Sequence, residues 1–78
     1  GFVKTAETVC YAIFREVLRQ ARQFDCQQFM VLAHQDVIER LLDEESAPLG
    51  ELQVLTGKPI RLQTESLYGP DQYDVVLM

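Results

Sequence analysis

The chain has 78 residues, of which 47% are hydrophobic and 24% charged, and its formal net charge is −5 at pH 7. A chain of this length forms one small domain that buries only about 60% of the surface of its unfolded form, so we expect it to gain stability from a neighbour. The negative charge argues against a strong autonomous nucleic-acid binder, because phosphate binding draws mainly on Lys and Arg. The longest apolar run, residues 29–33, is far too short to cross a membrane, so no membrane partner is expected.

The two cysteines, Cys10 and Cys26, are too far apart in the sequence for a C-x-x-C redox pair or a zinc knuckle. We expect both to be reduced thiols. The chain begins at Gly1 with neither an initiator Met nor a targeting signal. This start predicts a terminal piece of a larger protein, whose chemistry would lie upstream.

The first predicted element is a helix over residues 6–24. Its apolar residues fall on one arc when placed at helical intervals, as on a helix packed against a core. They are Ala6, Cys10, Ile13, Phe14, Val17, Ala21 and Phe24. Thr5 can cap the start of this helix, and Glu7 suits its first turn.

Residues 29–32 lack polar alternation and predict a strand that is buried on both faces. His34 then opens a second helix, where its side chain can accept a hydrogen bond from a free helix amide. Apolar residues at helical spacing mark this helix: Val37, Ile38, Leu41 and Leu42. Residues 43–46 predict a solvated acidic connection.

A short third helix is predicted from Leu49, Leu52 and Leu55, with Pro48 in its first turn and Gly57 at its C-terminus. Residues 60–65 alternate between apolar and polar side chains, which predicts a strand with one solvent-exposed face. Residues 67–71 form a turn cluster. The last strand is 73–78. The sequence thus predicts a small α/β (α+β) domain of two or three layers in the order α-β-α-α-β-β. Its three-stranded mixed sheet would end in a C-terminal antiparallel hairpin.

Arg15, Arg19 and Arg22 form a stripe at i, i+4 and i+7 on the first helix, with Tyr11 nearby. One interpretation is an RNA contact, in which the arginines bind phosphates and Tyr11 stacks on a base. The other is a solvated helix face, since the stripe lies opposite the apolar arc. The net charge of −5 favours the second interpretation.

The remaining polar clusters predict no catalytic and no metal-binding residues. The acidic residues Asp36, Glu39, Asp43, Glu44 and Glu45 lie along a short helix and its exit instead of converging as a metal site requires. His34 is the one histidine and fits a local structural role. Cys10 belongs to the core face and suits packing better than nucleophilic chemistry.

Six stretches of the chain resemble the ribonuclease G branch of the ribonuclease E/G family. They are residues 5–11, 15–16, 40–46, 57–60, 67–68 and 72–78. The resemblance implies that residues 1–78 are the family's single small C-terminal domain, thioredoxin-like in shape, with 1–4 the tail of a preceding link. The parent would be a cytoplasmic bacterial endoribonuclease that depends on Mg²⁺. It would cleave single-stranded RNA in the maturation of the 5′ end of ribosomal RNA and in mRNA turnover.

No catalytic residue of that family maps onto this chain, and its Mg²⁺ and Zn²⁺ would be bound upstream. The resemblance therefore implies a non-catalytic domain that supports the nuclease or its oligomerisation. Its candidate partners would be the remainder of the parent, a second copy of the domain, and RNA only through the parent. The alternative is an accessory RNA-binding module that uses the face formed by Tyr11, Arg15, Arg19 and Arg22.

Overall fold

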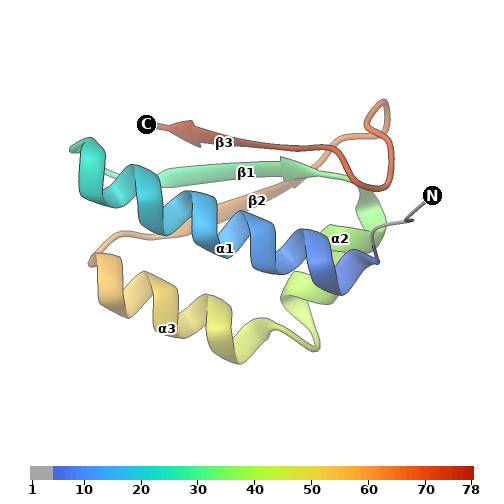
Figure 1. Ribbon diagram of the computed structural model, residues 1–78, viewed down its shortest axis with the longest axis horizontal. Coiled ribbons are helices and arrows are strands. Elements are labelled where there is room, and N and C mark those ends of the chain that lie inside the picture. Colours follow the sequence, from blue (N-terminus) through green and yellow to red (C-terminus); the bar gives the residue numbers. More distant parts are fainter. Residues whose placement is uncertain (1–4) are drawn as a thin grey trace.

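The computed structural model describes residues 5–78, so the predicted link tail, 1–4, lies outside the described residues. Three helices and three strands follow one another in the predicted order (Figure 1). They are α1 (Ala6–Gln23), β1 (Phe29–Ala33), α2 (Gln35–Leu42), α3 (Ser46–Thr56), β2 (Ile60–Thr64) and β3 (Tyr73–Leu77). The predicted α+β class and the order α-β-α-α-β-β are confirmed. None of the helices in residues 5–78 is long and apolar enough to cross a membrane.

The sheet is mixed, as predicted, but its strand order is β2-β1-β3. β1 pairs in parallel with β2 and antiparallel with β3, with Val31 opposite both Leu62 and Val75. The predicted C-terminal hairpin is therefore wrong, because β2 and β3 are not neighbours. The segment 65–72 is long enough to carry the chain past the end of β1, where the Glu65 amide donates to the Ala33 carbonyl at 2.9 Å.

One face of the sheet is packed and the other is open. Phe29, Val31 and Ala33 of β1 are fully buried, whereas Met30 and Leu32 between them are partly exposed. The prediction that this strand is buried on both faces is therefore wrong for the second face. Figure 1 shows the helices gathered on one side of the sheet, so the domain has two layers.

α1 begins as its sequence predicts, and it buries Val9, which lies outside the predicted arc, together with three residues of that arc. The Thr5 hydroxyl accepts a hydrogen bond from the Thr8 amide at 3.2 Å, which satisfies one of the free amides of the first turn. Its buried stripe is Val9, Cys10, Ile13 and Val17. The helix stops one residue early, because Phe24 is already in extended backbone. The Phe24 side chain consequently leaves the apolar arc and is 53% exposed.

α2 also begins as predicted: Nδ1 of His34 accepts a hydrogen bond from the Asp36 amide at 3.1 Å. α3 ends as predicted at Gly57, which takes the left-handed conformation with φ 71°. It begins at Ser46, with no side-chain cap from Glu45. This start places Pro48 in the first turn, where a proline costs no hydrogen bond.

The acidic connection between α2 and α3 is not fully solvated, contrary to prediction. Glu45 is only 6% exposed, and its carboxylate lies 3.5 Å from Nε of Arg40. Arg40 also pairs with Glu44 at 2.9 Å and with Glu7 of α1 at 3.6 Å. The Arg40 guanidinium thus connects the start of α1 to the link between α2 and α3. Its ion pair with Glu45 accompanies the burial of that carboxylate.

Candidate functional site

The four residues predicted as a possible RNA contact all lie exposed on α1, away from the core stripe. They are Tyr11, Arg15, Arg19 and Arg22. The structure therefore brings them to one helix face, as their spacing predicts. Their surroundings differ, however, in the hydrogen bonds and ion pairs that each side chain already makes.

Arg19 is held by its own helix. Its Nε donates to Glu16 at 3.1 Å, its Nη1 donates to Gln23 at 3.0 Å, and its Nη2 also contacts Glu16. The hydrogen bond from Arg19, with a second from Gln20, lowers the pKa of Glu16 to about 2. The same pairing raises the pKa of Arg19 above its usual value. Both side chains stay ionised at neutral pH and largely balance each other's charge.

Arg15 and Arg22 have no ion pair and no side-chain hydrogen bond within residues 5–78. The other exposed arginine, Arg61 of β2, donates to Gln28 at 2.9 Å. The charges of Arg15 and Arg22 are therefore the least compensated on α1.

Tyr11 has a partner for its hydroxyl, which donates to Glu7 at 3.1 Å. This hydrogen bond raises the pKa of Tyr11 above its usual value. The ring lies 6.4 Å from that of Phe14, centroid to centroid, and the residue is 48% exposed. About half of the Tyr11 residue is thus accessible from solvent.

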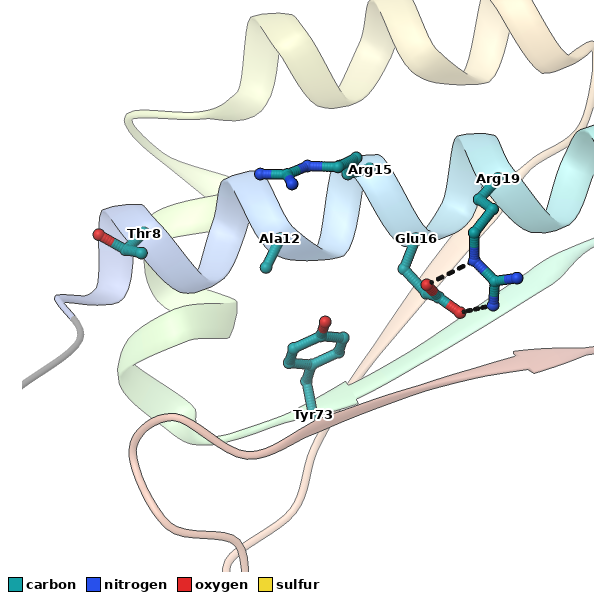
Figure 2. A pocket seen from close by; sticks show the side chains of 6 residues that line it. All are labelled: Thr8, Ala12, Arg15, Glu16, Arg19 and Tyr73. Carbon is teal, nitrogen blue, oxygen red and sulfur yellow. Dashed lines mark hydrogen bonds and ion pairs between the residues drawn. The ribbon is translucent and has the colours of Figure 1, made fainter.

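A hollow of about 380 Å³ lies between α1 and β3. It is lined by Thr8, Ala12, Arg15, Glu16, Arg19 and Tyr73. Figure 2 shows the Tyr73 side chain rising from β3 with its hydroxyl directed toward α1. Sequence reasoning missed Tyr73. Its alternation with Val75 and Leu77 was a signal for the inner face of a strand, but not for a position beside α1.

A second hollow lies on the outer side of α3 and is almost entirely apolar. It is lined by Ser46, Ala47, Gly50, Glu51, Val54 and Leu55 and has a volume of about 600 Å³. Val54 is 83% exposed and Leu55 is 70% exposed. Leu55 was predicted as part of the helix's apolar set with Leu49 and Leu52, but only the latter two are buried.

The other predicted clusters are separate from both hollows. Asp36, Glu39, Asp43 and Glu44 line a shallow depression around Arg40. Among residues 5–78, no three His, Cys, Asp or Glu side chains are placed to hold a metal ion. Cys10 and Cys26 are free thiols. Burial raises the pKa of Cys10 to about 11, so its thiol is protonated at neutral pH.

No protein-family model matches the chain. Over 78 aligned residues it is 46% identical to ribonuclease G of Salmonella typhimurium (strain SL1344) and to that of Escherichia coli (strain K12). The identity is again 46%, over 79 residues, with ribonuclease G of Haemophilus influenzae. Each match covers 100% of this chain but only 16% of the relative. The chain is therefore, over its whole length, a homologue of one small part of ribonuclease G.

Proposed function

We propose that this chain is the non-catalytic C-terminal domain of a ribonuclease G-like enzyme and that it docks on the remainder of that enzyme through the outer face of α3. The complete protein would be a Mg²⁺-dependent endoribonuclease of the bacterial cytoplasm that cleaves single-stranded RNA. It would act in the maturation of ribosomal RNA 5′ ends and in mRNA turnover. The homology to ribonuclease G along the whole chain supports this parentage. The non-catalytic role rests on the resemblance, which puts the family's catalytic aspartates and both of its metals upstream.

The exposed apolar face of α3 is the observation that carries the docking role. Val54 and Leu55 project from a helix whose other large apolar residues, Leu49 and Leu52, already pack on the core. Burying one such side chain contributes about 1.5–3 kcal/mol. A small domain with a limited core gains most from covering these residues.

The occupant we assign to this face is the preceding part of the same protein. The chain spans 16% of the length of its relatives, so most of a ribonuclease G lies outside it and is available to cover α3. The small residues beside Val54 and Leu55 would let a docking partner approach α3 closely. Ala47 is exposed, and a Cβ atom added at Gly50 would meet no atom within 4 Å. Glu51 is the only charged residue lining the hollow, so little charge would be desolvated.

The docking role is tested with the double variant Val54→Asp/Leu55→Asp in the complete nuclease. We expect the domain to be released, which limited proteolysis would detect as faster cleavage before it. Circular dichroism of the 78-residue chain with the same substitutions should be unchanged, since both side chains are exposed. Leu67→Asp is the matched control, because Leu67 is also exposed but lies in the turn before β3.

Two outcomes would contradict this assignment. Equal proteolysis of the double variant and the parent would show that α3 is not the docking face. Sedimentation of the 78-residue chain as a dimer that the double variant dissociates would assign the face to a second copy. The non-catalytic role is checked separately: RNA incubated with the pure chain and Mg²⁺ should stay intact.

A further inference from the structure

We propose that the hollow between α1 and β3 binds a backbone phosphate of single-stranded RNA, with Arg15 as the principal ligand and Thr8 and Tyr73 as hydroxyl donors. This role goes beyond docking, and it uses α1 and β3 instead of the outer face of α3. The two functions can therefore fail independently.

The charge distribution selects this surface. Arg40 and Lys58 pair with carboxylates, Arg40 with Glu44 at 2.9 Å and Lys58 with Asp25 at 2.8 Å. Arg15 has no such partner within residues 5–78, although the domain carries a net charge of −5. A guanidinium that keeps its donors free can bind a phosphate in a bidentate manner.

Two further hydroxyl donors, Thr8 and Tyr73, line the same hollow. Tyr73 directs its hydroxyl toward α1, and no side-chain hydrogen bond involves this hydroxyl among the described residues (Figure 2). The Thr8 hydroxyl lies 3.1 Å from that of Thr5 and can rotate to donate to a ligand. The volume of about 380 Å³ is near the lower end for ligand sites and leaves ample room for a phosphate group.

Glu16 lines the same hollow but does not repel an anion strongly. Its carboxylate accepts hydrogen bonds from Arg19 and from Gln20, the latter at 2.7 Å. The formal charge of the lining is +1, because Arg15 and Arg19 contribute +2 and Glu16 contributes −1. Arg19 thus neutralises Glu16 and leaves the charge of Arg15 for the ligand.

The surface continues along α1 in a way that fits a chain of phosphates. Arg22 lies two turns after Arg15, about 10 Å along the helix axis. The exposed part of the Tyr11 ring lies on the same helix face, where a base from a flexible strand can stack. A rigid duplex presents no free base to Tyr11, so single strands are favoured.

The test measures the anisotropy of a labelled single-stranded RNA titrated with the 78-residue chain at low salt. Binding should weaken as salt increases. Arg15→Ala should weaken binding and lower the slope of log affinity against log salt by about 0.7, the value for one phosphate contact on a single strand. Tyr73→Phe should weaken binding without changing that slope.

Arg61→Ala is the matched control, because it also removes one exposed arginine but from β2, away from the hollow. We expect it to leave binding unchanged, and circular dichroism should confirm that all variants fold. An equal loss of affinity in Arg61→Ala would overturn the proposal, since any cation would then serve. Absence of binding at low salt, or equally tight binding of duplex RNA, would overturn it as well.

Discussion

The contrast between Arg15 and Arg19 shows how the nearest side chains on a helix decide what a charged residue can do. Glu16 lies three residues before Arg19, a spacing at which side chains on one helix face meet. Arg15 has no carboxylate at the corresponding position. The sequence therefore already contained the information that separates a paired arginine from a free one, although periodicity alone groups the two together.

The pairing of Glu16 should make stability depend on pH. Because its pKa in the folded state is about 2, below the ordinary 4.5, its contribution is present above pH 4.5 and is lost as the pH falls toward 2. Glu16→Gln should therefore be less stable than the parent at pH 7, and the two should converge toward pH 2. Urea unfolding at several pH values measures this difference. Glu51→Gln is the control for the loss of one carboxylate, because Glu51 makes no ion pair in the described part of the chain.

His34 should behave as a helix cap and not as a catalytic base. Its Nδ1 accepts the Asp36 amide, so His34→Ala should lower the free energy of unfolding by about 0.5–2 kcal/mol. His34→Asn should retain most of the stability, because the asparagine oxygen can accept the same bond. Thermal or urea unfolding of the three proteins checks this. Equal stability of the alanine and asparagine variants would contradict the capping role.

At the scale of elements, the helices were predictable and the environment of α3 was not. The 3.6-residue periodicity of α1 identified Cys10, Ile13 and Val17 of its buried stripe from local sequence, although not Val9. In α3, Leu55 has the spacing of a core residue, yet the helix packs through Leu49 and Leu52 and leaves Leu55 in solvent. Which part of an apolar face is covered depends on neighbouring elements, and those neighbours are set by long-range packing.

The two glycines of α3 should respond in opposite directions to alanine. Gly57 has a positive φ of 71°, which strains any residue with a Cβ, so Gly57→Ala should destabilise the domain by about 1 kcal/mol. Gly50 is inside the helix with open space around it, so Gly50→Ala should stabilise the domain by about 0.5–1 kcal/mol. Urea unfolding of the two variants provides the comparison. A loss of stability in Gly50→Ala would indicate that α3 is not a regular helix in solution.

At the scale of the whole molecule, the strand order decides which residues can form a site. A hairpin of the last two strands would have put Tyr73 beside β2, away from its present place beside α1. Pairing of β3 with β1 instead puts Val75 opposite Val31 and brings Tyr73 into the lining of the hollow with Thr8 and Arg15. Short loops favour hairpins, but the segment 65–72 allows either pairing. Of the residues that line the hollow, the sequence therefore singled out Arg15 and Arg19 on α1, and it could not place Tyr73 of β3 beside them.

Amide hydrogen exchange should distinguish the two strand orders directly. In the order β2-β1-β3, successive amides of β1 donate alternately to its two neighbours. At the start of the strand, Phe29 donates to Pro59 at 3.0 Å and the preceding Gln28 donates to Met78 at 3.3 Å. Every amide of β1 should therefore be protected, whereas β2 and β3, as edge strands, should show protection only at alternate residues. Native-state exchange followed by NMR measures this pattern. Continuous protection along β2, with alternate protection in β1, would restore the hairpin order and remove Tyr73 from the hollow.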